Sequence, residues 1–243
     1  VVIASSLEGD LSLDVAAGAV KMKVETVLKG GEHVKVGQKL DAIYYGKVEV
    51  GRRFLLSGVD PPNLQWSCLP VSERAEEYIV KASKVEDDPV ARLKFFRHYL
   101  EDEEALISRD AYDEFAKAPY DDVIALKAKM HHDRLINWIK DRDVPASRRR
   151  LYFTMLGVCG NLDDAELLQG MMTSSNRQDK AGLDALLACY LILQPEDGLV
   201  NVEKHFLKNK DAEYADTYAA IMAIRFHGNQ TDVIPKEHLV KSL

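Results

Sequence analysis

The stretch Ser83-Lys84-Val85-Glu86-Asp87-Asp88 divides the 243-residue sequence into two parts with different hydrophobic periods. Before it, apolar residues alternate in short runs that glycine and proline separate, a pattern typical of β-strands. After it, apolar residues recur at i, i+3, i+4 and i+7, a pattern typical of amphipathic helices. The sequence therefore predicts an α+β chain of two domains, a β domain over residues 1–85 and an α-helical domain over residues 86–243.

Turn-forming residues separate the strands that we expect in the first domain. Gly30-Gly31 supplies positive φ angles that other residues resist, and Pro61-Pro62 cannot donate hydrogen bonds to a sheet. Ser72 is then a candidate N-cap for a helix. Short strands followed by a helix indicate a small OB-like barrel. The expected strands are Val1–Leu7, Ala19–Leu28, Gln38–Tyr45, Arg52–Ser57 and Leu64–Val71.

Three consecutive pieces of this domain carry a family pattern. Val24–Gly30 is a strand that ends in Lys-Gly, Val34–Leu40 contains a Val-Gly turn, and Val50–Leu56 is a glycine-initiated strand with an aromatic residue. These pieces resemble the netrin-like family, whose OB barrels occur in metalloproteinase inhibitors (TIMP-like) and in secreted bacterial proteins. Inhibitory members begin with a zinc-chelating Cys, and no Cys precedes Cys68 here, so that activity is not expected. The resemblance implies an extracytoplasmic setting, periplasmic or exported, and because the chain starts at Val1 we expect a removed leader or another segment before it.

Apolar helices recur at a spacing of 35 residues in the second domain. Leu151–Leu156, Leu186–Leu191 and Ile221–Phe226 align when the sequence is shifted by this spacing, and amphipathic segments follow the first two. One helical hairpin cannot bury both of its apolar faces, so its neighbours must cover them. The spacing resembles that of HEAT-like repeats, which stack into a superhelix. The order of a barrel followed by a superhelix resembles the layout of uncharacterised bacterial exported proteins. The expected helices are Pro89–Leu100, Ser108–Lys117, Tyr120–Met130, Asp133–Lys140, Ala146–Val158, Asp163–Met172, Ala181–Leu193, Val200–Leu207, Ala212–Phe226 and Pro235–Leu243, with Asp133 and Asp163 expected as N-caps.

Composition argues against several classes of function. A formal net charge of -7 opposes a dominant role in coating nucleic acid, which requires a basic surface. The longest apolar run, Leu183–Leu193, is shorter than the roughly 20 residues of a membrane-spanning helix, so no span is expected. Cys68, Cys159 and Cys189 are odd in number and lack a Cys-x-x-Cys pair, so we expect free thiols that pack as small hydrophobic groups.

Two polar clusters are candidate sites. Arg148-Arg149-Arg150 opens an apolar helix, where cations oppose the helix dipole and need partners. One interpretation is a set of ion pairs between repeats; the other is an anion or acidic-peptide site on the concave face of the superhelix. The imidazole and carboxylate groups of His131-His132-Asp133 could ligate a metal ion. Adjacent helical residues point about 100° apart, however, which favours a solvated helix junction. The acidic residues near the arginines in sequence are Asp141, Asp143, Asp163 and Asp164.

The sequence contains no Gly-x-Ser-x-Gly elbow, no phosphate-binding glycine loop and no His-Glu-x-x-His, and it carries no cofactor signature. We therefore expect a non-enzymatic interaction or scaffold protein that binds a protein partner on its helical surface and uses no cofactor. One alternative is an enzyme with dispersed catalytic residues. The other is an OB-type nucleic-acid-associated protein. Its candidate contacts are Tyr44, Tyr45, Phe54, Trp66, Lys47, Arg52 and Arg53.

Overall fold

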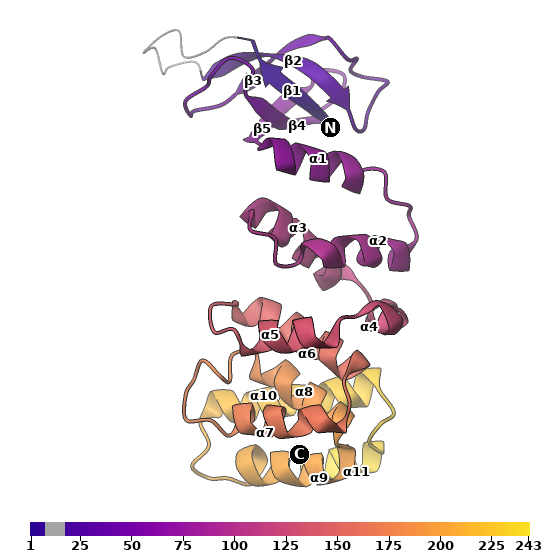
Figure 1. Ribbon diagram of the computed structural model, residues 1–243, viewed down its shortest axis with the longest axis vertical. Coiled ribbons are helices and arrows are strands. Elements are labelled where there is room, and N and C mark those ends of the chain that lie inside the picture. The colour runs from indigo at the N-terminus through magenta and orange to yellow at the C-terminus, as the bar shows by residue number, and fades with distance from the viewer. Residues whose placement is uncertain (8–17) are drawn as a thin grey trace. The chain divides into compact units, whose positions relative to one another are not determined.

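A computed structural model of the chain describes residues 1–7 and 18–243 (Figure 1). These residues form two compact units. The barrel unit comprises residues 1–86 and 101–109, and the array unit comprises residues 87–100 and 110–243. A small β-barrel followed along the chain by helices confirms the α+β, two-part fold expected from the change of hydrophobic period.

Most bounds of the helices and strands lie close to those expected from the sequence, but the helix expected to begin at Val200 begins at Pro195. The barrel unit contains β1 (Val2–Ser6), β2 (Ala19–Val27), β3 (Lys39–Ile43), β4 (Arg53–Val59), β5 (Gln65–Pro70) and α1 (Glu73–Ala82). Helix α3 (Ala105–Lys117) begins in the barrel unit and ends in the array unit. The array unit also contains α2 (Pro89–Phe96), η1 (Arg97–Tyr99), α4 (Tyr120–Ala125), η2 (Lys127–Lys129), α5 (His132–Lys140), α6 (Ala146–Cys159), η3 (Leu162–Asp164), α7 (Ala165–Met172), α8 (Leu183–Leu193), α9 (Pro195–Val202), the π-helical segment η4 (Glu203–Leu207), α10 (Tyr214–Gln230) and α11 (Lys236–Ser242).

The strands close into a barrel in the order β1-β2-β3-β5-β4, which fits an OB fold. All neighbouring pairs are antiparallel except β3 and β5, which meet in parallel at Ile43 and Ser67. Alternate residues of β2 and β4 point inward, so Met22, Val24 and Phe54 are fully buried in the barrel core. Burial of these side chains supplies the main driving force for closing the barrel.

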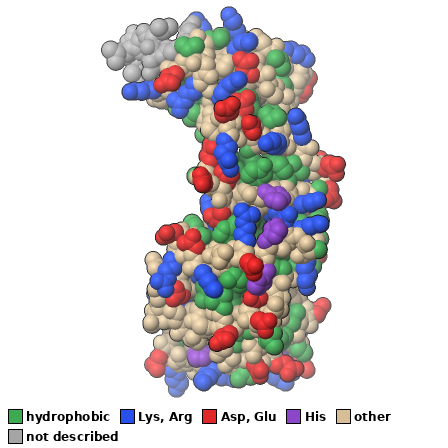
Figure 2. Space-filling model, in the orientation of Figure 1, with side chains coloured by type: hydrophobic (Ala, Val, Ile, Leu, Met, Phe, Trp, Pro, Cys, Tyr) green, Lys and Arg blue, Asp and Glu red, His purple; other side chains and the backbone are tan. Residues whose placement is uncertain are grey.

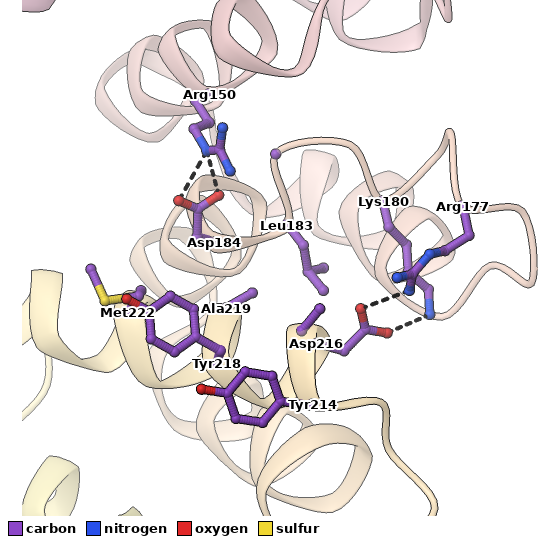
Figure 3. Close-up of a pocket in the computed structure, with 12 residues that line it drawn as sticks. Arg150, Arg177, Lys180, Leu183, Asp184, Tyr214, Asp216, Tyr218, Ala219 and Met222 are labelled. Atoms are coloured by element: carbon purple, nitrogen blue, oxygen red, sulfur yellow. Dashed lines mark hydrogen bonds and ion pairs between the residues drawn. The ribbon is translucent and has the colours of Figure 1, made fainter.

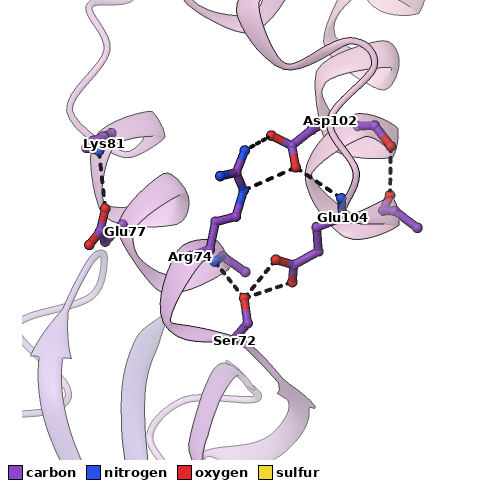
Figure 4. Close-up of polar contacts among 9 residues, drawn as sticks. Ser72, Arg74, Glu77, Lys81, Asp102 and Glu104 are labelled. Atoms are coloured by element: carbon purple, nitrogen blue, oxygen red, sulfur yellow. Dashed lines mark hydrogen bonds and ion pairs between the residues drawn. The ribbon is translucent and has the colours of Figure 1, made fainter.

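Helix α1 is capped as the sequence predicts, and it also holds the acidic segment that precedes α3 (Figure 4). The Ser72 hydroxyl accepts a hydrogen bond from the Ala75 amide at 2.9 Å and donates to the Glu104 carboxylate at 2.8 Å. The Arg74 guanidinium donates to the Asp102 carboxylate through both Nε and Nη2. These bonds attach residues 101–104 to the barrel unit, although residues 87–100 belong to the array unit.

The three apolar helices spaced 35 residues apart in the sequence are α6, α8 and α10, and α8 packs against both of the others (Figure 1). Tyr152, Phe153 and Leu156 of α6 are fully buried, and so are Leu186 and Leu187 of α8. Ala219, Ala220 and Ala223 of α10, which contacts α8, are also buried. The stacking of equivalent helices is therefore confirmed in the array unit.

Two expected N-caps were misplaced. Asp133 lies in the first turn of α5, which begins at His132 after the N-cap His131. Asp163 lies inside η3, whose N-cap is Asn161 in a capping box with Asp164. In this box the Asp164 carboxylate accepts from the Asn161 amide, and a backbone amide at the start of η3 donates to the Asn161 side chain. The misplacement arises because several adjacent polar residues can cap a helix, and tertiary contacts select among them.

Candidate functional site

A pocket of about 440 Å³ opens on the array unit where the start of α8 meets the start of α10. Tyr214, Tyr218 and Met222 line it from successive turns of α10, and Leu183 lines it from α8 (Figure 3). Charged side chains from α6, α8, α10 and the segment before α8 stand at its two ends. The pocket therefore has an apolar centre and two polar ends.

The two tyrosines of α10 form an exposed aromatic surface beside this pocket. Their spacing of four residues places Tyr214 and Tyr218 on the same face of the helix. Their rings are stacked, with centroids 6.3 Å apart and an interplanar angle of 21°. Tyr214 is 84% exposed and Tyr218 is 53% exposed. Tyrosines combine a large apolar ring with a polar hydroxyl, and such side chains are enriched where proteins contact partners.

Arg150 and Asp184 form the ion pair at one end of the pocket. The Nε of Arg150 lies 2.7 and 3.0 Å from the two carboxylate oxygens of Asp184. The Arg150 side chain is half exposed, so its Nη groups can still donate to another acceptor. This pair joins α6 to α8 and leaves a guanidinium donor at the mouth of the pocket.

Asp216 forms the centre of the polar group at the other end. Its carboxylate, which is mostly buried, accepts hydrogen bonds from Arg177 Nη1 at 3.2 Å and from Lys180 Nζ at 3.0 Å. Arg177 also lies 2.9 Å from the Glu213 carboxylate and remains more than half exposed. This group joins the segment before α8 to the first turn of α10.

The structure separates the three arginines that the sequence places together. Arg149 is 1% exposed, and its guanidinium donates to the backbone carbonyls of Gln178 and Asp179 and lies 5.8 Å from the ring centre of Phe153. Burial lowers the pKa of Arg149 from its ordinary value. Arg148 is partly buried, and Arg150 alone of the three lines the pocket. Successive helical residues point about 100° apart, which separates their environments.

The partners of Arg149 and Arg150 lie one repeat further along the chain, between residues 178 and 184. Two further ion pairs span a similar length of sequence, Arg142 with Asp179 across 37 residues and Lys180 with Asp216 across 36. The acidic residues close to the arginines in sequence, Asp141, Asp143, Asp163 and Asp164, are therefore not the acceptors for Arg149 and Arg150. Stacking brings together residues of successive hairpins, so proximity in sequence did not identify the partners of these two arginines.

The His131-His132-Asp133 cluster is divided between a helix cap and an ion pair. His131 is the N-cap of α5, and it makes no side-chain capping bond. The Nε2 of His132 lies 2.8 and 3.0 Å from the Asp164 carboxylate, and its Nδ1 lies 3.2 Å from Asp133. Hydrogen bonds to Asp133 and to Asp164 raise the pKa of His132. His132 thus links α5 to η3.

The aromatic residues considered for nucleic-acid stacking serve mainly the barrel core. Phe54 is fully buried, and Tyr44 and Trp66 pack against the same core. Tyr45 is 78% exposed. Arg52 lies 5.7 Å from the ring centre of Phe54 and donates to a backbone carbonyl of the loop that precedes β4. Three of the four aromatic side chains are therefore engaged in packing.

Residues 1–7 and 18–243 contain all three cysteines and all seven histidines of the chain. No group of three or more His, Cys, Asp or Glu side chains in this part of the chain is arranged to hold a metal ion. The three thiols are free; burial raises the pKa of each, and that of the fully buried Cys189 most strongly. The helices described here are too short or too polar to cross a bilayer.

Sequence reasoning found Arg150 but missed the tyrosines that line the same pocket. The available signal was the Tyr-x-x-x-Tyr spacing of Tyr214 and Tyr218 at the start of an apolar helix. Nothing in the sequence indicated that the start of α10 would lie beside Leu183 and Arg150. That placement depends on how α8 and α10 pack.

We expect Arg149→Met to destabilise the array unit by about 1–3 kcal/mol for each carbonyl that it leaves without a partner. The adjacent Arg150→Met is the matched control, because the ion pair of Arg150 with Asp184 is solvated and contributes less than about 1 kcal/mol. Urea denaturation followed by circular dichroism measures both changes. Equal losses for the two variants would contradict the structural role assigned to Arg149.

We expect the contribution of His132 to stability to decrease as the pH rises. A raised pKa means that the folded state favours protonated His132. The stabilisation is therefore fully present below about pH 6.5, the pKa of an unperturbed histidine, and it is lost as the pH rises through the higher pKa of the folded state. Because the side chain is 38% exposed, screening limits the effect to about 0.5 kcal/mol. The measurement compares wild type with His132→Gln at pH 6 and pH 8.5, with the exposed His238→Gln as control. A larger difference at pH 8.5 would contradict the prediction.

No family model, no curated protein and no solved structure matches this chain.

Proposed function

We propose that this chain is a non-enzymatic interaction protein whose helical array binds a protein partner. The observation that carries the proposal is the exposed, stacked pair Tyr214 and Tyr218 at the mouth of the α8–α10 pocket. Burying two tyrosine rings against a partner would remove a large apolar area from water, and aromatic side chains in such positions often dominate binding energy.

The polar ends of the pocket define the chemistry of the segment that we propose it binds. The lining contains three cationic side chains and two carboxylates, an excess of one positive charge. Glu213 contacts Arg177 from outside the lining, and the guanidinium groups of Arg150 and Arg177 keep exposed donors. We therefore propose an acidic segment whose apolar or aromatic side chain enters the centre and whose carboxylates accept from the guanidinium groups.

The arrangement of charges supports binding rather than acid–base catalysis. Each carboxylate in the pocket is already paired with a cation, Asp184 with Arg150 and Asp216 with Arg177 and Lys180. Such pairs fix the side chains that frame the pocket and present donors at known positions. An acid or base acting on a substrate needs instead a group free to exchange its proton with the substrate.

We also propose that the array belongs to the HEAT-like repeat class and the barrel to the netrin-like class, in an exported protein. The 35-residue spacing of α6, α8 and α10 and the repeated ion pairs between hairpins support the first assignment. The glycine-turn pattern of Val24–Leu56 supports the second. In this proposal the barrel anchors or orients an array that holds the partner.

We expect a displayed library of random peptides to yield binders that combine Asp or Glu with an aromatic or large apolar residue. The double variant Tyr214→Ala/Tyr218→Ala should weaken the affinity of the selected peptide by at least tenfold, because it removes both aromatic contacts. Arg150→Gln should weaken the same peptide less and should reduce its dependence on salt. Fluorescence anisotropy of the labelled peptide measures these changes.

The control for this experiment is Tyr45→Ala, which removes an exposed tyrosine of the barrel unit and should leave the affinity unchanged within twofold. Selection of basic peptides, or equal affinity for wild type and the double tyrosine variant, would contradict the proposal. Arg149 is not used as a test position, because its buried contacts with the Gln178 and Asp179 carbonyls make it structural.

A further inference from the structure

A second, smaller cavity in the array unit has a different chemistry. Its volume is about 20 Å³, and it lies between η1 and the start of α5. Four cationic or titratable side chains line it. Arg97 and His98 belong to η1, His131 is the N-cap of α5, and Arg134 lies within α5. The remaining lining is apolar, from leucine, methionine and tryptophan side chains. On the face drawn in Figure 2, histidine side chains lie among lysine and arginine side chains.

Arg97 has buried donors without acceptors in the described part of the chain. Its Nε and Nη1 atoms are buried and have no hydrogen-bond partner there. Its Nη2 lies 3.4 Å from Nε2 of His98, a long contact in which neutral His98 can accept from one donor of Arg97 only. A guanidinium group that loses water without gaining an acceptor is unfavourable, so an acceptor that reached these donors would stabilise the arrangement.

The other polar groups of the cavity are also cationic or can become so. Arg134 lies with its guanidinium carbon 5.0 Å from the Trp138 ring centre, which holds this cation beside the cavity. Burial lowers the pKa of His98, and the positive charges of Arg97, Arg134, His131 and Lys94 lower it further. The lining includes no carboxylate. Asp133, in the first turn of α5, is fully exposed and lies 3.2 Å from His132, outside the lining.

We propose that Arg97, Arg134, His98 and His131 form a binding site for a phosphoryl group. Two planar guanidinium groups and two imidazoles offer more donors than one planar carboxylate accepts, and a tetrahedral dianion presents acceptors in several directions. The cavity is about the size of one water molecule, so it admits one oxygen of the group and leaves the rest of the group outside. The start of α5, whose N-cap makes no side-chain bond, adds partial positive charge.

The ligand is either free phosphate or a phosphorylated side chain of a partner, and both present the same oxygens. Binding of a dianion raises the pKa of His98, because it opposes the positive charges that lower that pKa in the free protein. The site therefore takes up a proton with its ligand, and affinity increases as the pH falls from 8 to 6. Sulfate, which stays dianionic over this range, separates this effect from the titration of phosphate itself.

The test is isothermal titration calorimetry of the full chain with inorganic phosphate, sulfate, a phosphoserine peptide and acetate. We expect saturable binding of inorganic phosphate, sulfate and the phosphoserine peptide. The affinity for these probes should be at least tenfold weaker in Arg97→Gln and in Arg134→Gln. Arg225→Gln, which changes an exposed arginine of α10 outside both pockets, should bind phosphate within twofold of wild type. Tighter binding of the phosphoserine peptide than of inorganic phosphate would assign the ligand to a partner, and the reverse would assign it to the free ion.

The proposal is overturned if wild type binds none of the phosphoryl probes or sulfate, or if binding persists unchanged in both arginine variants. It is also overturned if acetate binds as tightly as phosphate, because the site is then selective for carboxylate or for any anion. Circular dichroism checks that each variant is folded. Arg134 is exposed, so Arg134→Gln keeps the test valid even if Arg97→Gln does not fold.

Discussion

The array depends on the burial of α8 on every side. Asp184 is its only charged residue, and residues 186–191 are all buried. A helix that is apolar all round must be covered by neighbours, and α6, α7, α9 and α10 all contact it. Two of its polar groups bond to neighbouring helices: the Tyr190 hydroxyl accepts from Asn201, and the Ala188 carbonyl lies 3.0 Å from Nε2 of the buried His227. Without these neighbours α8 would expose a large apolar surface to water.

The same constraint positions the tyrosine pocket. Because residues 186–191 are enclosed, the first turn of α8 is the part that reaches the pocket, through Leu183 and Asp184. Gly182, just before this turn, has φ = 81°, and a Cβ there would lie 3.3 Å from the Ala146 carbonyl of α6. Glycine thus lets the chain enter α8 close to α6, which brings Asp184 within 2.7 Å of Arg150.

The positions of the helices and strands could be predicted from the sequence more accurately than the contacts between them. Gly30-Gly31 and the alternation around Met22 and Val24 were sufficient to place strands, because turn chemistry and burial on one face are local properties. The 35-residue spacing was sufficient to pair α6, α8 and α10, because equivalent helices stack. It could not identify Asp184 as the partner of Arg150, or bring Tyr214 to Leu183, since both depend on the exact packing between hairpins. The buried donors of Arg97 were equally invisible, because burial of single atoms is a tertiary property.

The binding surface proposed for this chain is thus a consequence of how its apolar helices are enclosed. Native-state amide hydrogen exchange of the full chain tests this claim most directly, because it reports the free energy of opening each helix. We predict that the amides of α8 exchange slowest in the array unit and that α6 and α10 open together with it. Exchange in α8 as fast as in the terminal helix α11, while α6 or α10 stays protected, would contradict it.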